Sequence, residues 1–397
     1  MGVLIKKQRG FYSFTGVAKL SIIAFIVALA YSFVDTIWAV YAESIFHNLS
    51  TISFYSSFLS VLAFASYFFL IPIIEKRNKS KLFSVSLIFV GISFLIFFLS
   101  RNFVLFVLSS IILTVFTSLR INSFGIIVRD RSSSKNISRN EGLMYTFFNI
   151  AWLIGPLLAG YIAQAFGVYL IFLFSAIFIA VGLLLFKFSN INDANISKKA
   201  EYGIVKNFVS FFKNKRLRNA YIVGGGVNFW LILIYLYMPL YILQKGLNDI
   251  WIGYFLFGIT VPVVLFEYFF SKLAGKIGFK KIFKVGFFIL FASALACFFI
   301  ESIYVAMLIL VFASIGIAML EPTTEAYFFE VLRSKEEENK FYGPYNTTID
   351  ASHFVGKLLA GVLFLFLPFR FVFVFFAFFM FLYFLFCFKL IEAKKRK

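Results

Sequence analysis

The chain is poor in charged residues, and this scarcity narrows its class. Asp, Glu, Lys and Arg make up 14% of the 397 residues, about half their share in an ordinary soluble domain. Hydrophobic residues account for 61%, and the mean hydropathy is +0.92. A soluble fold of this composition would expose large apolar patches to water. A cytosolic enzyme and a disordered chain are therefore excluded, and an integral membrane protein remains.

Cysteine and histidine are also scarce. The only two cysteines, Cys297 and Cys387, lie inside apolar runs, which excludes a disulfide framework. No His, Cys or Asp cluster has the spacing of metal ligands, so we expect no metal. No Gly-rich phosphate loop follows a strand, and no nucleotide-binding domain is evident. We therefore expect no cofactor, and a proton gradient is the expected source of energy.

Long apolar runs dominate what is present. A membrane-spanning segment must be a helix or part of a closed barrel, and the alternation that marks barrel strands is absent. We therefore expect an all-α integral membrane protein with twelve transmembrane helices. The runs cover residues 18–46, 52–74, 82–100, 102–127, 142–165, 167–187, 219–244, 250–271, 283–300, 302–329, 342–367 and 369–391.

A net charge of +20 is compatible with nucleic-acid binding, but the positions of the cations favour a different explanation. With both termini inside, three of the 38 lysines and arginines lie outside (Arg101, Lys245 and Arg370). Three more lie within helices, and the remaining 32 face the cytoplasm. This is the positive-inside pattern. We expect a multi-pass protein of the plasma membrane with cytoplasmic termini and no nucleic-acid partner.

An internal repeat divides the chain. Residues 142–160 and 343–361 match at an offset of 201, through Gly142/Gly343, Thr146/Thr347, Gly155/Gly356 and a closing Leu-Leu-Ala-Gly. The loops that begin at residues 74 and 274 correspond at an offset of 200. We expect two six-helix repeats, over residues 1–187 and 219–397, joined by a cytoplasmic linker over 188–218. A parallel duplication of six helices is typical of secondary transporters that rock between two states.

The linker carries a possible amphipathic helix. Apolar residues recur at helical spacing beside lysines: Ile204, Val205, Phe208, Val209 and Phe212. This pattern is typical of a helix that lies in the membrane interface. A flexible linker is the alternative.

Two loop motifs and one helix motif carry a family resemblance. The segment 271–281 keeps Leu273, Gly278 and several basic residues, including Lys280, of the pattern G-x-L-a-D-r-x-G-r-k, with Gly275 in place of the acid. The copy after the second helix keeps Glu75 and Lys76. On these motifs the chain resembles a major facilitator superfamily transporter over essentially its full length.

The fifth expected helix makes the resemblance more specific. Residues 151–160 are similar to the signature G-x-x-x-G-P-x-x-G-G of drug:proton antiporters, through Gly155, Pro156 and Gly160. Small residues allow close helix packing, and Pro156 permits a bend. Close packing without antiport is the alternative. The resemblance implies a conformational role for Glu75, Lys76, Gly155, Pro156, Gly160, Gly278 and Lys280.

Ionisable residues inside spanning helices are costly and therefore candidates for function. The family fold places the third, sixth, ninth and twelfth helices against lipid, and these have no charged residue in their interiors. The candidates for proton coupling or for the substrate cavity lie on other helices, and Glu267 is weaker because it lies near a helix end. The candidates are Asp35, Arg120, Glu321, Glu325, Asp350, His353 and Lys357.

The spacing of these residues suggests how they act. Asp350, His353 and Lys357 share one stripe of a helix. Arg120 and Glu321 are equivalent in the repeat. Counted along ideal helices, Arg120, Glu321 and Asp350 lie roughly 12–15 Å from the cytoplasmic ends. We expect Arg120 to pair with Glu321 or Asp350, and Asp35 with Lys357. Structural ion pairs that fix helix register are the alternative.

We therefore expect a secondary active transporter that works by alternating access. The first interpretation is proton-coupled export of small hydrophobic or amphipathic compounds, which the aromatic residues, including Phe229, Trp230 and Tyr237, would suit. The alternative is proton-linked uptake or exchange of a polar metabolite, a sugar or an organic acid whose carboxylate Arg120 and Lys357 bind. Ionisable groups at membrane depth argue against an enzyme. We expect a monomer whose partners are a small-molecule substrate and the lipid bilayer.

Overall fold

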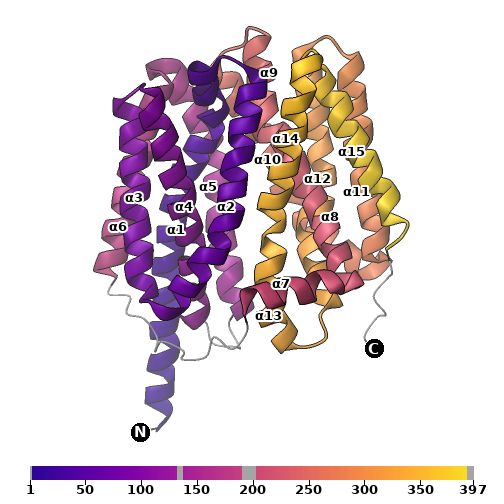
Figure 1. Ribbon diagram of the computed structural model, residues 1–397. Coiled ribbons are helices and arrows are strands. Elements are labelled where there is room, and N and C mark those ends of the chain that lie inside the picture. The colour runs from indigo at the N-terminus through magenta and orange to yellow at the C-terminus, as the bar shows by residue number, and fades with distance from the viewer. Residues whose placement is uncertain (1, 132–136, 190–202, 391–397) are drawn as a thin grey trace. The chain divides into compact units, whose positions relative to one another are not determined.

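The computed structural model describes residues 2–131, 137–189 and 203–390, which form helices and no strand (Figure 1). The first part of the chain contains α1 (Gly2–Phe46), α2 (Leu49–Lys76), α3 (Lys79–Leu99), α4 (Phe103–Arg131), α5 (Ile137–Phe166) and α6 (Val168–Phe188). The second part contains α7 (Ile204–Lys213), α8 (Lys215–Ile232), a π-helical segment η1 (Leu233–Tyr237), α9 (Met238–Gln244), α10 (Asp249–Ile277), α11 (Phe279–Phe299), α12 (Ile303–Val331), α13 (Lys335–Asn346), α14 (Thr348–Phe366) and α15 (Phe371–Cys387).

The helices have the length and composition of membrane spans. Within the described residues, 11 segments are long and apolar enough to cross a bilayer, which takes about 20 residues. The segments α8, η1 and α9 together form one of them, and α13 and α14 form another. The helix α15 is shorter, at 17 residues, and occupies the twelfth expected run. The predicted all-α membrane fold is confirmed.

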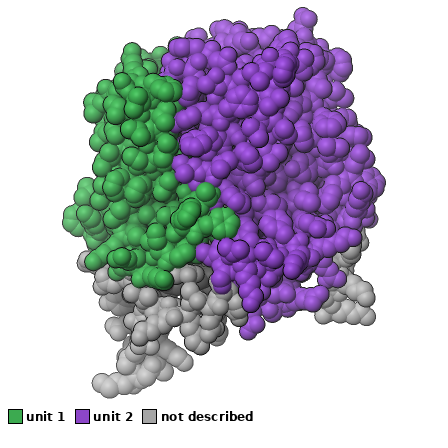
Figure 2. Space-filling model, in the orientation of Figure 1, with its two compact units in different colours: residues 1–37, 65–200 green, residues 38–64, 201–397 purple. Residues whose placement is uncertain are grey.

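The chain divides into two compact units, shown in separate colours in Figure 2. Unit 1 comprises residues 1–37 and 65–200, and unit 2 comprises residues 38–64 and 201–397. The end of α1 and the start of α2 therefore pack with the second part of the chain. The division at residues 187 and 219 expected from the sequence remains a prediction about the repeat.

Packing inside each unit reflects the internal repeat. In unit 1, α3 packs against α4 and α6, and in unit 2, α11 packs against α12 and α15. Gly155 of α5 lies against Ser32 of α1, and Gly356 of α14 lies against Ile232 of α8. The glycines are 201 residues apart and their partners 200 apart, so both repeats use the same close helix contact.

Two expected helices depart from regular α-helical geometry. The run 219–244 passes through the π-helical segment, which lies just before Pro239, a residue that cannot donate a backbone hydrogen bond. The run 342–367 breaks at Thr347, whose hydroxyl donates to the Pro344 carbonyl at 2.7 Å. Side chains of this kind compete with helical hydrogen bonds. The hydropathy of the sequence does not reveal this competition between side-chain and backbone hydrogen bonds.

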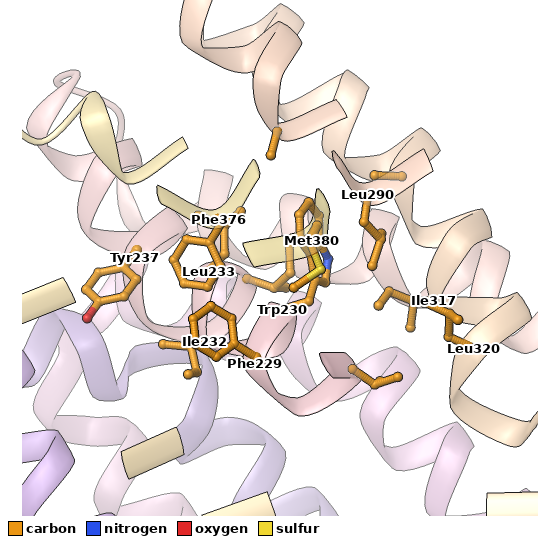
Figure 3. Close-up of a cluster of buried hydrophobic side chains, with 14 of the residues drawn as sticks. Phe229, Trp230, Ile232, Leu233, Tyr237, Leu290, Ile317, Leu320, Phe376 and Met380 are labelled. Carbon is orange, nitrogen blue, oxygen red and sulfur yellow. The ribbon is translucent and has the colours of Figure 1, made fainter. Parts of the chain in front are cut away.

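The core of unit 2 combines aliphatic side chains with buried aromatic rings (Figure 3). Phe229 and Trp230 of α8 and Tyr237 of η1 are at most 2% exposed. The Phe229 ring stacks on Phe375 of α15, with centroids 5.8 Å apart, and Phe287 stacks on Tyr383 at 5.4 Å. Rings that fill a packed core have no free surface for a substrate, so the aromatic content does not by itself indicate a lipophilic binding site.

The contact at Gly356 can be tested by adding one methyl group. A Cβ at this position would lie 3.0 Å from the Phe229 ring and closer still to Ile232, both buried. We expect Gly356→Ala to lower the free energy of unfolding by about 1–3 kcal/mol, a typical cost of overpacking. Gly275→Ala is the matched control, because nothing lies within 4 Å of its Cβ. The measurement is the temperature of thermal unfolding in detergent. Equal unfolding temperatures of the two variants would contradict the contact.

Candidate functional site

The predicted ionisable stripe lies on α14, one of the helices that pack against α8 in unit 2. Asp350, His353 and Lys357 are all half-buried there. Asp350 lies in the first turn, where the helix dipole favours a carboxylate. Lys357 is within electrostatic range of both Asp350 and His353. The structure therefore brings these three predicted residues together.

The stripe has partners on two other helices. The Lys357 Nζ donates to Ser60 Oγ of α2 at 3.2 Å, and one turn away the Ser57 hydroxyl donates to the Phe354 carbonyl at 3.0 Å. The His353 ring interacts with the backbone of Asn228 in α8. Its Nε2 is buried and has no hydrogen-bond partner. A buried nitrogen left unpaired is costly, which makes it a candidate binding atom.

A second group of predicted residues lies on α12. Glu321 and Glu325 are one turn apart, and Glu321 is exposed whereas Glu325 is half-buried. Glu267 of α10 and Glu325 both lie within electrostatic range of Glu321. The Tyr342 hydroxyl donates to Glu325 Oε1 at 3.4 Å. Glu267, a weak candidate from its place in the sequence, thus belongs to a group of three carboxylates.

Arg120 is held in unit 1 by an aromatic face. Its guanidinium lies over the Tyr31 ring of α1, 4.1 Å from the centroid, and the Tyr31 hydroxyl bonds to Thr117 at 2.8 Å. The buried Nε has no hydrogen-bond partner. Asp35, also half-buried, follows Tyr31 by one turn. The expected pairs of Arg120 with Glu321 or Asp350, and of Asp35 with Lys357, join different units and remain predictions.

The glycines and the proline of the conformational motifs are buried in α5 or lie at a turn between helices. In α5, Gly155, Pro156 and Gly160 are buried, and a Cβ at Gly155 would overlap Ser32. Gly278 has φ +92° between α10 and α11, a conformation that glycine adopts without strain.

The basic residues of these motifs differ in environment. The Lys280 Nζ donates to the carbonyls of Phe388 and Leu390, at 2.8 and 3.0 Å, and so stabilises the end of α15. Lys76 is exposed, and the Glu75 side chain lies outside the described residues.

Several residues of these sites were missed by sequence reasoning. Tyr31, Ser60 and Asn228 contact predicted residues. The Glu43 Oε2, near the C-terminal end of α1, is buried without a hydrogen-bond partner. The only signal for Ser60 is the serine-rich face of α2, and uncharged residues in apolar runs give little else. Among the described residues, no group of three or more His, Cys, Asp or Glu side chains is placed to hold a metal ion.

Comparisons with known proteins show the family of the chain. The family model described as the Major Facilitator Superfamily matches residues 20–264 and 256–397. The chain belongs to the major facilitator superfamily. It is therefore a multi-pass membrane transporter and not an enzyme, as predicted. The search of curated proteins finds no match.

Solved structures share the superfamily fold. A POT family transporter in complex with 5-aminolevulinic acid has a TM-score of 0.79 at 15% identity, covering 94% of this chain and 95% of that one. The nucleoside transporter NupG has a TM-score of 0.74 at 13% identity, covering 95% and 100%. A bacterial homologue of the iron transporter ferroportin in its inward-facing state also has a TM-score of 0.74 at 13% identity, covering 95% of this chain and 98% of that one. At these identities the likeness shows the fold alone, and the drug:proton antiporter branch is not distinguished.

Proposed function

We propose that this superfamily member is a secondary active transporter that works by alternating access and is driven by protons. The α14 stripe is the single observation that carries the proposal. Asp350, His353 and Lys357 are three ionisable groups on one face of a spanning helix, and the buried His353 Nε2 has no hydrogen-bond partner. Fixing helix register would need one pair of charges, and the third group is then available for exchange of a proton.

The carboxylates of α12 are further candidates for proton exchange. Glu321 and Glu325 lie one turn apart, and Glu267 adds a third carboxylate within electrostatic range of Glu321. Carboxylates that interact electrostatically titrate as a coupled group. We propose that they exchange protons with one side of the membrane and that the α14 stripe couples proton loading to substrate binding.

For the substrate, we keep export of small hydrophobic or amphipathic compounds as the first proposal. It is supported by the resemblance of the α5 signature to that of antiporters. The burial of Phe229, Trp230 and Tyr237 in the core of unit 2 removes one argument for it. We further propose that the protein is a monomer of the plasma membrane, that both termini are cytoplasmic, and that a proton gradient is its only energy source.

Arg120 favours a second candidate, transport of an organic anion. Tyr31 covers one face of the guanidinium, and stacking on that face does not use the N–H donors at the edge. The unpaired Nε belongs to that edge, and together with one terminal nitrogen it can bind a carboxylate through two parallel hydrogen bonds. An amphipathic carboxylate would satisfy both candidates.

The first test concerns coupling. We expect Asp350→Asn and His353→Ala each to abolish flux driven by a pH gradient in proteoliposomes, because each removes a proton-accepting group from the stripe. Val355→Ala is the matched control, since Val355 lies on the exposed face of the same helix. All three variants should remain folded in detergent. Normal flux in both stripe variants would show that the stripe is structural.

The second test concerns the charge of the substrate. Each small carboxylate is paired with its neutral amide as a test ligand. The measurement is how far each ligand raises the thermal stability of the purified protein. If Arg120 binds an anion, Arg120→Gln should weaken carboxylate binding roughly 10–100-fold, the range for a charged hydrogen bond. Arg120→Lys should restore it only in part, because lysine lacks the planar fork. Equal stabilisation by amides and carboxylates would contradict the anion proposal and leave the coupling proposal intact.

A further inference from the structure

The helix α7 has one face that anchors it to unit 2. Phe208 and Phe211 are buried, and Phe211 is fully so. The Phe211 ring contacts Phe341 of α13 and Tyr221 of α8, with centroids 5.9 Å apart in each case. A helix occupies part of the segment in which the sequence suggests one, but Phe208, expected on its membrane-facing side, is buried together with Phe211.

A second face of α7 is apolar and exposed. Val205 is 68% exposed, Val209 49% and Phe212 37%. Their spacings of four and three place them on one stripe, about 100° around the helix from the anchoring face. We call these three residues the apolar stripe. Exposed apolar residues that form a stripe of this kind mark a contact surface.

Cations adjoin the apolar stripe. Lys206 and Lys213 occupy the next sector of α7, and Lys215 and Arg218 lie in the first turn of α8, all of them exposed. Residues 203–218 contain no acidic residue. A helix N-terminus disfavours positive charge, so the cations at the start of α8 would be stabilised by an external anion. Arg216 is not counted with these four cations. It lies within electrostatic range of Tyr327, and so does Glu330.

The position of α7 indicates the occupant. The spanning segment that contains α8 begins at Lys215, and Asn214 forms the corner by accepting a hydrogen bond from the Arg216 amide at 3.0 Å. In Figure 1, α7 runs across the end of α8 rather than along it. An amphipathic helix at this depth, with an apolar stripe beside cations, fits a lipid surface with anionic headgroups.

We propose that this face of α7 binds the anionic leaflet of the membrane. The apolar stripe enters the boundary between headgroups and acyl chains, and the four cations contact lipid phosphates. The surface is independent of the transported substrate and of the coupling ion.

Lipid binding at α7 would act on the inner part of unit 2. Tyr221, which contacts Phe211, bonds to Thr347 through its hydroxyl at 3.3 Å. The Thr348 hydroxyl donates to the Tyr221 carbonyl at 2.9 Å. These contacts connect α7 to the first turn of α14, where Asp350 lies. The membrane contact therefore helps to position the end of the helix that carries the ionisable stripe.

Hydrogen exchange on the full-length protein tests the proposal. The protein is reconstituted in nanodiscs of phosphatidylcholine, with or without phosphatidylglycerol. We expect the α7 amides to exchange at least about fivefold more slowly with the anionic lipid, since each cation near an anionic surface contributes roughly a factor of five. Lys206→Gln/Lys213→Gln should remove most of this difference. Val205→Ser/Val209→Ser should speed exchange in both bilayers.

The matched control is Lys276→Gln/Lys281→Gln, which removes two exposed lysines near the junction of α10 and α11. This variant should keep the full protection of α7 by phosphatidylglycerol. Equal exchange of α7 in the two bilayers would overturn the proposal. So would loss of protection in the control to the same extent as in Lys206→Gln/Lys213→Gln.

Discussion

In a bilayer, every polar group must find its partner inside the protein, and the rest of this structure depends on that constraint. Backbone groups are satisfied within helices. Serine and threonine hydroxyls follow the same rule locally, as when Ser53 bonds to the Leu49 carbonyl at 2.8 Å and Thr114 to the Ser110 carbonyl at 2.8 Å. Such local bonds let a chain rich in serine remain compatible with lipid. Charged groups have no equivalent local solution, so their positions are informative.

The cations of the predicted outer face show how a charge is accommodated. Arg101 lies over the Tyr169 ring at 4.2 Å, Lys245 over Tyr241 at 5.4 Å, and Arg370 over Phe298 at 5.6 Å. All three expected outside cations thus rest on aromatic rings, a favourable arrangement. Arg120 uses the same interaction with Tyr31, but its buried Nε has no hydrogen-bond partner. This buried nitrogen makes Arg120 a candidate binding group.

Much of the fold could be predicted because it depends on hydropathy and on the repeat. The apolar runs place the spanning helices, and the offset of 201 residues anticipates the matching contacts of Gly155 and Gly356. The break at Thr347 and the π-helical segment before Pro239 were missed because hydropathy does not report local hydrogen bonding. The burial of Phe211 was missed because hydropathy does not distinguish lipid from protein.

The candidate site could be predicted only in part. Spacing in the sequence gives the depth of a residue and its stripe on a helix, so Asp350, His353 and Lys357 were correctly placed together. It does not give the rotation of one helix against its neighbour. The contacts of Lys357 with Ser60 and of Arg120 with Tyr31 depend on that rotation and appear only in three dimensions.

Proton movement coupled to substrate movement tests the central claim most directly. Proteoliposomes with a pH-sensitive dye inside can be exposed to candidate substrates, with valinomycin and potassium to remove electrical potentials. Proton-driven transport predicts that any substrate that crosses changes the internal pH, and that a proton ionophore abolishes its accumulation. Substrate accumulation without a change in internal pH, and undiminished by the ionophore, would contradict it.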